Sequence, residues 1–114
     1  MNTQEFIEVV REVVIEESIK SVQSNLINPP GRKPSETLIQ CSKFYNNLPD
    51  NEKSIIIQII KESVLTGVWG LFCVLDGVRS IENDDKGKLT LFYEKDGVKT
   101  ILNDPQNELL HELL

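Results

Sequence analysis

The chain has 114 residues, of which 39% are hydrophobic and 26% are charged, a composition typical of a single soluble globular domain. Its 18 acidic and 12 basic residues give a formal net charge of −6, which argues against the basic surface that nucleic-acid binding requires. We therefore expect one domain spanning residues 1–114 and no nucleic-acid partner.

The N-terminus and the cysteines indicate a compartment. The first residues lack the basic and apolar regions of a secretory signal, so we expect a cytoplasmic protein. Two cysteines, Cys41 and Cys73, are too few for a disulfide framework. We expect both to be buried free thiols.

The first predicted element is a helix from Asn2 to about Asn25. Asn2 followed by Glu5 matches a capping box at a helix start. One face of this helix carries glutamates one turn apart, which we call the acidic stripe: Glu5, Glu8, Glu12 and Glu16. An acidic surface speeds encounter with a basic partner, although it equally serves as a solvated face.

A second, shorter helix is expected after the proline-rich segment 28–34, which cannot continue a helix. Ser35 is its predicted N-cap. The helix ends before Pro49, and Asp50 is a candidate cap for the helix that follows.

The third predicted helix, residues 55–81, is the most apolar part of the chain, and we expect it to be central and buried on most sides. Its longest uncharged stretch, 63–75, is 13 residues, short of the ~20 that a membrane span needs. The sequence therefore predicts no membrane partner. Gly67, Gly70 and Gly77 indicate either close packing of a neighbouring backbone or a kink.

A β-hairpin is predicted from 89–94 and 98–102 around the turn pair Asp96-Gly97. A two-residue loop places Glu94 opposite Lys99, and a bulge at Gly97 is the alternative. Asp104 is the predicted N-cap of a last helix. The expected fold is a mainly helical α+β domain: three to four helices around a long central buried helix, a C-terminal hairpin and a short terminal helix.

The sequence offers little catalytic chemistry. His111 is the one histidine, and its spacing from the cysteines does not suggest a zinc site. A cysteine nucleophile served by His111 is disfavoured because both cysteines are expected to be buried, whereas a reactive thiolate needs an accessible, electropositive setting. The acidic loop 82–88 lacks the ligand and glycine positions of a calcium loop. We therefore predict no catalytic residue, metal site or cofactor, and a protein that is not an enzyme.

One polar group stands out at the end of the central helix. Asp76, Arg79 and Glu82 follow one another at one-turn spacing, which predicts an internal ladder of ion pairs. The alternative is a ligand pocket in which Asp76 and Arg79 lie beside Trp69 and Tyr45. A closed, fully paired ladder would favour the structural role, and unpaired charges in a concave pocket would favour the ligand site.

Several segments, NPPGRKP, FYNNLP and VLDGVRSIE, followed by a KDG hairpin, LNDP and LHELL, resemble a small bacterial domain family without an established activity. The resemblance covers nearly the whole chain and implies no functional residue. By type and not by motif, the chain is also similar to immunity proteins of bacterial toxin systems.

These observations leave three hypotheses of function. The first is a non-catalytic protein-binding module, such as an immunity or antitoxin-type inhibitor, that meets a basic partner through the acidic stripe and through loop residues Glu82, Asp84 and Asp85. The second is a small-molecule sensor or minor enzyme with a pocket near Trp69, Asp76 and Arg79. The third is a structural homodimer, which needs a large exposed apolar patch.

Overall fold

The computed structural model describes residues 1–84 and 87–114 of the chain. Its elements in chain order are α1 (Thr3–Val9), the π-helix η1 (Val10–Glu16), α2 (Glu17–Ile27), α3 (Glu36–Asn46), α4 (Asp50–Leu75), β1 (Phe92–Lys95), β2 (Val98–Ile101) and α5 (Leu110–Leu113). The predicted mainly helical α+β fold with a C-terminal hairpin and a short terminal helix is confirmed.

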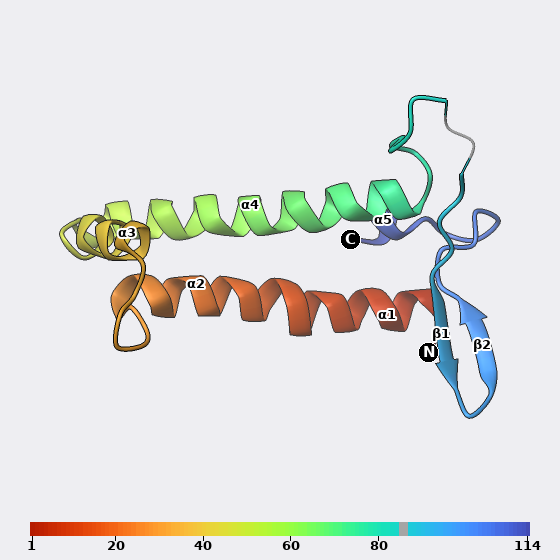
Figure 1. Ribbon diagram of the computed structural model, residues 1–114, viewed down its shortest axis with the longest axis horizontal. Helices are drawn as coiled ribbons and strands as arrows, with labels where there is room; N and C mark the ends of the chain where they lie inside the picture. Colours follow the sequence, from red (N-terminus) through yellow and green to blue (C-terminus); the bar gives the residue numbers. More distant parts are fainter. Residues whose placement is uncertain (85–86) are drawn as a thin grey trace.

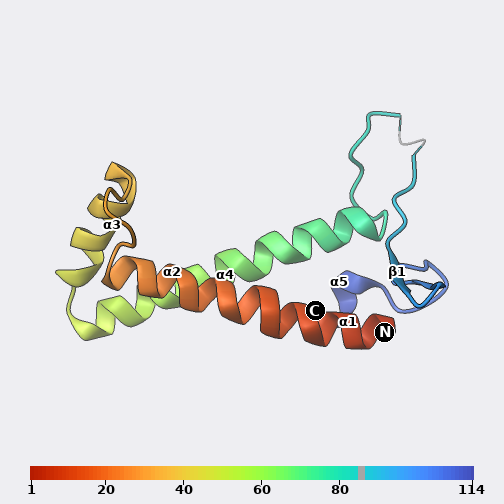
Figure 2. The same cartoon turned by 60° about the horizontal axis from the view of Figure 1, so that its bottom comes forward.

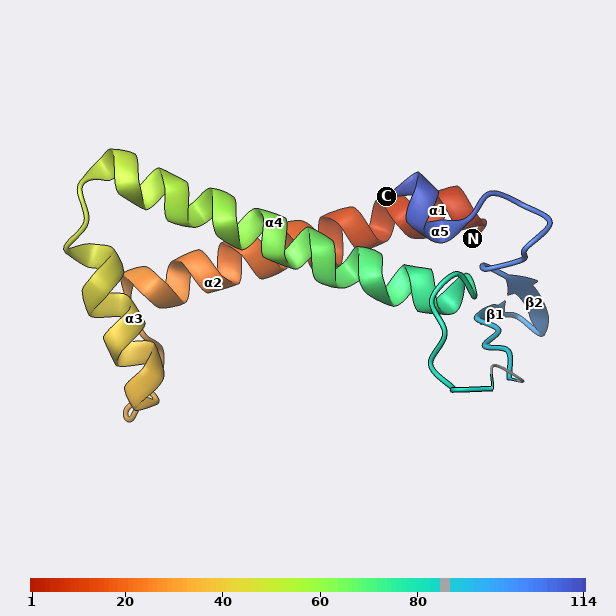
Figure 3. The ribbon, with the colours of Figure 1, turned by 90° about the horizontal axis from the view of Figure 1, so that it is seen from above.

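Two long helical elements form the body of the molecule. The elements α1, η1 and α2 join into one continuous rod, and α4 runs back along this rod in the opposite direction (Figure 1). Seen from above, α4 crosses the rod obliquely (Figure 3). The helix α3 lies at one end of this helical hairpin, while the β-hairpin, α5 and both termini lie at the other (Figure 2).

The N-terminus of the rod is fixed by its predicted capping box. The Asn2 side chain accepts a hydrogen bond from the Glu5 amide at 2.9 Å, and the Glu5 carboxylate accepts one from the Asn2 amide at 2.9 Å. Two amides that the first turn would leave unpaired are thereby satisfied.

The π-helical segment explains a break in the apolar pattern of the rod. Ile7 and Val10 are buried, and the next buried residue is Ile15, five positions after Val10. A π-turn closes its hydrogen bonds between residues five apart, so it takes in one extra residue and returns Ile15 to the core. Val13 and Val14, which an α-helix would turn toward the core, are 63% and 42% exposed.

The short helix α3 begins at its predicted cap, because the Ser35 hydroxyl accepts a hydrogen bond from the Leu38 amide at 3.2 Å. The buried side chains Ser42 and Tyr45 turn α3 toward α2 and α4. Cys41 lines an open groove beside this contact and is exposed, so the expectation that both cysteines are buried is wrong for Cys41 and right for Cys73.

The helix α4 is continuous through Gly67 and Gly70, so neither glycine splits it into two helices. It ends at Leu75, before the predicted end at Ile81. Gly77, with φ at +77°, adopts the left-handed conformation that ends many helices, and its amide donates to the Val74 carbonyl at 3.1 Å.

The same helix is far less buried than its sequence predicts. Of its 26 residues, only Gly70, Phe72 and Cys73 are buried, so the expectation of burial on most sides is wrong. The physical reason is the number of layers: α4 packs on one long rod, and the short helices α3 and α5 cover only parts of its remaining surface. A single helical neighbour covers one stripe and leaves the remaining apolar surface outside.

The overall dimensions are those of an elongated molecule. The radius of gyration is 18.2 Å, whereas a compact domain of this length has about 13 Å. The accessible surface is 8299 Å², against about 6,300 Å² for a compact protein of this mass. The chain therefore exposes about 2,000 Å² more surface than a closed fold of its size.

The β-hairpin has the predicted register. Glu94 lies opposite Lys99, and Phe92 lies opposite Ile101. Asp96 and Gly97 both have positive φ, 53° and 78°, as a type I′ turn requires, so the two-residue loop is correct and the bulge is not.

Candidate functional site

A buried polar side chain with several partners is Asp76, which follows the last residue of α4. Its Oδ1 accepts a hydrogen bond from the Leu110 amide at 3.0 Å, and its Oδ2 accepts one from the His111 amide at 2.9 Å. The same Oδ2 lies 2.7 Å from Nδ1 of the His111 ring. The Asp76 side chain is fully buried, so these bonds replace all of its contact with water.

Asp76 therefore caps α5 from a distant part of the chain. The free amides at a helix start need acceptors, and a carboxylate also suits the positive end of the helix dipole. The predicted cap, Asp104, is wrong, because α5 begins only at Leu110. Asp104 instead accepts from the Gln106 amide at 3.0 Å, within the turn that precedes the helix.

Aromatic contacts extend the site outward from His111. The His111 ring meets Trp69 edge-on, with centroids 5.9 Å apart and planes at 85°. The Arg79 guanidinium lies 5.7 Å from the centroid of the Trp69 ring, a cation–π distance. Arg79 fits there because Gly70 has no side chain: a Cβ at Gly70 would lie 2.8 Å from Nη1 of Arg79. Gly70 thus has a packing role.

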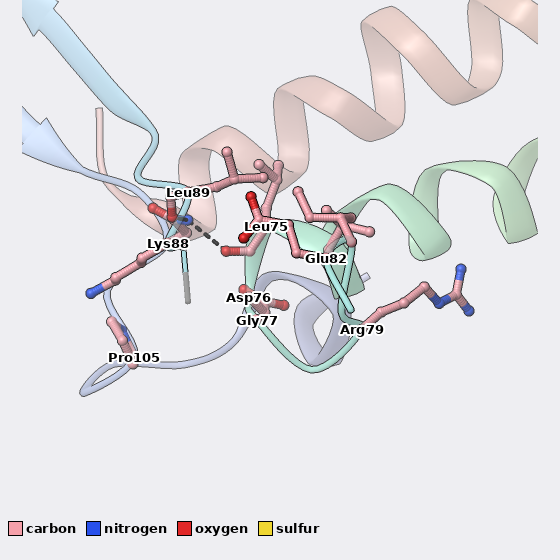
Figure 4. Close-up of a pocket in the computed structure, with 12 residues that line it drawn as sticks. Leu75, Asp76, Gly77, Arg79, Glu82, Lys88, Leu89 and Pro105 are labelled. Carbon is pink, nitrogen blue, oxygen red and sulfur yellow. Dashed lines mark hydrogen bonds between the residues drawn. The ribbon is translucent and has the colours of Figure 1, made fainter. Parts of the chain in front are cut away.

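The predicted ladder of Asp76, Arg79 and Glu82 is wrong as a set of ion pairs. Asp76 bonds to α5, Arg79 lies on Trp69, and no ion pair joins the three within the described part of the chain. Figure 4 shows the Arg79 guanidinium directed away from Asp76. Helical spacing predicted this ladder, but the helix ends at Leu75, so the three residues do not share a helix face.

A cavity of about 410 Å³ lies between the end of α4, the following loop and the start of the hairpin (Figure 4). Asp76, Arg79, Glu82 and Lys88 are among the residues that line it. Since the Asp76 carboxylate is bonded to α5 and the Arg79 guanidinium lies on Trp69, Glu82 and Lys88 are the charged lining residues without such a contact in the described structure. The cavity is large enough for a small polar molecule.

Tyr45 does not belong to this site. It is buried in α3, at the opposite end of α4 from Asp76 (Figure 1). Its ring there lies 5.7 Å from Nζ of Lys53. The structure therefore brings together three of the four predicted pocket residues, Trp69, Asp76 and Arg79, and separates Tyr45 from them.

The acidic stripe is exposed along its whole length, as are Glu82 and Asp84 of the loop. Asp85 lies outside the described residues. Arg11, the one basic side chain within residues 1–17, is drawn away from the stripe: its Nη2 donates to the Leu113 carbonyl at 2.6 Å and to the Leu114 oxygen at 2.7 Å. Of the four stripe residues, only Glu5 is part of an ion pair in the described structure, with the terminal amine 3.9 Å away.

Asn103 is a site residue that the sequence did not reveal. It is buried, and its amide nitrogen donates to the Leu75 carbonyl at 2.7 Å and to the Leu89 carbonyl at 2.9 Å. Its side-chain oxygen accepts from the Leu91 amide at 2.8 Å. In sequence, an asparagine before Asp-Pro indicates only a turn. Asn103 is buried only because the chain folds around it: its side chain joins the end of α4 to the segment that precedes β1.

The pairing of His111 with Asp76 was also missed. The sequence feature that could have predicted this pair is a lone histidine, His111, in a terminal helix that needs a cap, together with a carboxylate, Asp76, near the end of the preceding long helix. Within residues 1–84 and 87–114, no three His, Cys, Asp or Glu side chains lie close enough to hold a metal ion.

By length and composition alone, α4 is apolar enough to cross a membrane, with a mean hydropathy of 1.5 over its best window. Core helices of soluble proteins meet the same criterion. No family model matches the chain, and neither a curated protein nor a solved structure matches it.

Proposed function

We propose that the protein is a non-catalytic protein-binding module that meets a basic partner through the acidic stripe, in the manner of an immunity or antitoxin-type inhibitor. The observation that supports this proposal most is the position of Arg11. Its guanidinium binds the carbonyl of Leu113 and the oxygen of Leu114, so the stripe keeps its negative charge.

The geometry suits recognition by charge. The four carboxylates stand about one helical turn apart on a rod that holds them in fixed relative positions. Such a row attracts a basic surface over a Debye length, about 8 Å at physiological ionic strength. Exposed charges of this kind raise the association rate more than they lower the dissociation rate.

The test is affinity capture from a lysate of the source organism, followed by mass spectrometry, with wild-type bait and two charge-matched variants. Glu8→Lys with Glu12→Lys neutralises the stripe, because the two lysines offset the two remaining glutamates, and Glu52→Lys with Glu62→Lys makes the same change of charge on α4. We expect a basic protein that the wild type and the α4 variant retain and the stripe variant loses. Equal retention by all three baits would overturn the proposal.

A second candidate function is supported by the cavity of about 410 Å³ beside Asp76. There, Glu82 and Lys88 would bind a small polar ligand, and Asp76 would hold the cavity wall in place through α5. Thermal-shift screening of metabolites tests this candidate. A ligand that stabilises the wild type but not Lys88→Ala supports it, and equal stabilisation of both proteins argues against it.

A further inference from the structure

From Ile56 onward, one face of α4 carries no charged side chain and is partly or fully exposed. The face, which we call the seam, contains residues that recur every three or four positions: Ile56, Ile60, Ser63, Gly67, Leu71 and Val74. Such spacing places them on one side of a helix. The charged residues in the middle of α4, Lys61 and Glu62, lie on other sides. Leu71 is 57% exposed.

The seam continues into an apolar groove between α2, α3 and α4. The groove has a volume of about 430 Å³, and its lining includes Val22, Phe44, Ile56 and Ile60. Phe44 is 61% exposed at its edge. A phenylalanine this exposed beside an apolar groove is typical of a surface that another chain covers.

Small residues in the middle of the seam permit close approach. A Cβ at Gly67 would meet no atom within 4 Å, so nothing in the described chain explains why this helical position is a glycine. Glycine is unfavourable inside a helix, and it allows a neighbouring backbone to come near. The Ser63 hydroxyl donates to the Ile59 carbonyl at 2.7 Å, so it can be covered without losing a hydrogen bond.

The excess surface of the whole chain is of the size that a dimer interface buries. The chain exposes about 2,000 Å² more than a compact fold of its mass, and obligate homodimers bury about 1,000–2,500 Å² on each subunit. We propose that a second copy of the chain packs on the seam and the groove, so that two helical hairpins form a four-helix bundle. This inference goes beyond the proposed function and rests on different residues.

A second copy suits this surface better than a lipid bilayer does. Two chains of net charge −6 repel one another. The seam has no charged side chain, so two copies can meet there without bringing like charges together. In a bilayer, Lys61 and Glu62 near the middle of α4 would enter the hydrocarbon, where charged groups are costly. A two-fold dimer also needs only one self-complementary patch.

Sedimentation velocity of the full chain at micromolar concentration tests the inference. The wild type is expected at twice the chain mass of 13.0 kDa. Leu71→Glu and Phe44→Glu place a charge on the seam and at the groove edge, and both are expected to sediment as monomers with unchanged helical circular dichroism. Val98→Glu is the control, because Val98 is 65% exposed on the β-hairpin, and it should remain dimeric.

Three results would overturn the inference: a monomeric wild type, dimers that persist in both seam variants, or a Val98→Glu protein that dissociates like them. A monomeric wild type that co-sediments with phospholipid vesicles would assign the seam to a membrane instead. Because none of these variants touches the acidic stripe, capture of a basic partner through the stripe is tested separately.

Discussion

Oδ2 of Asp76 lies 2.7 Å from Nδ1 of His111, although the two residues are 35 positions apart in the chain. The contact fixes the terminal helix α5 to the end of α4. It also holds the His111 ring against Trp69, so one carboxylate organises the packing at this end of the molecule.

Replacing this carboxylate should destabilise the fold. We expect Asp76→Ala to lower the free energy of unfolding by about 3 kcal/mol, because it leaves two backbone donors near the core unsatisfied at about 1–3 kcal/mol each. Urea denaturation measures the change. The control is Asp104→Ala, which removes the cap that the sequence predicts and should cost about 1 kcal/mol or less. Equal losses for the two variants would contradict the assignment of the cap to Asp76.

Trp69 should report the same contact by fluorescence, since it is the one tryptophan of the chain. Trp69, Leu65 and Leu114 line a shared hollow, and His111 lies against the Trp69 ring. Trp69 is already 41% exposed, and releasing α5 in Asp76→Ala should expose more of the indole and shift its emission further to longer wavelength. Arg79→Ala removes the cation but leaves α5 capped, so its shift should be smaller. A larger shift for Arg79→Ala would mean that α5 does not depend on Asp76.

Asn103→Ala should be as damaging as the loss of Asp76. It removes three hydrogen bonds at a buried position, and we expect a loss of about 3 kcal/mol in the free energy of unfolding. The matched control is Asn107→Ala, at an exposed position, which should change stability by about 0.5 kcal/mol or less. Thermal unfolding followed by circular dichroism compares them. Similar melting temperatures for the two variants would show that the hydrogen bonds of Asn103 to Leu75, Leu89 and Leu91 do not stabilise the fold.

The turn of the β-hairpin makes a separate prediction. Gly97 has φ at +78°, and we expect Gly97→Ala to destabilise the hairpin by about 1 kcal/mol because a side chain is disfavoured there. Asp96→Asn should be nearly neutral, since asparagine tolerates the left-handed conformation. Chemical shifts of the strand residues measure hairpin population. A hairpin that persists fully in Gly97→Ala would contradict the type I′ turn.

Gly67→Ala distinguishes a free seam from a covered one by the sign of its effect. Within the monomeric Leu71→Glu background we expect Gly67→Ala to stabilise the protein by about 1 kcal/mol, through helix propensity alone. In the wild-type background the added methyl group should instead weaken the dimer, seen as a raised dissociation constant. An unchanged or tighter dimer would show that no backbone approaches Gly67.

Local sequence signals predicted local structure well. The capping box at Asn2, the N-cap at Ser35 and the turn at Asp96-Gly97 each depend on a few adjacent residues, and all three are confirmed. The fold class followed from these signals and from the apolar periodicity of α4.

The sequence could not predict how far α4 is buried, because this depends on how many other elements of the chain pack on it. An apolar pattern around a whole helix predicts burial, but it does not say whether the same chain or another surface covers that helix. Site predictions failed for a related reason. Asp76 and His111 meet only through tertiary packing. The ion pairs of Arg79 were predicted from helical spacing, which the actual helix end does not permit, and Tyr45 was placed in the pocket, from which the position of α3 separates it.

The claim on which the whole account depends is that the helical hairpin leaves α4 uncovered until another chain packs on it. Small-angle X-ray scattering of the monomeric Leu71→Glu variant tests this claim most directly, because no partner is needed. The account predicts a radius of gyration close to the 18.2 Å of the folded, elongated molecule. A value near the ~13 Å of a compact domain of this length would contradict it, since the seam would then be covered from within.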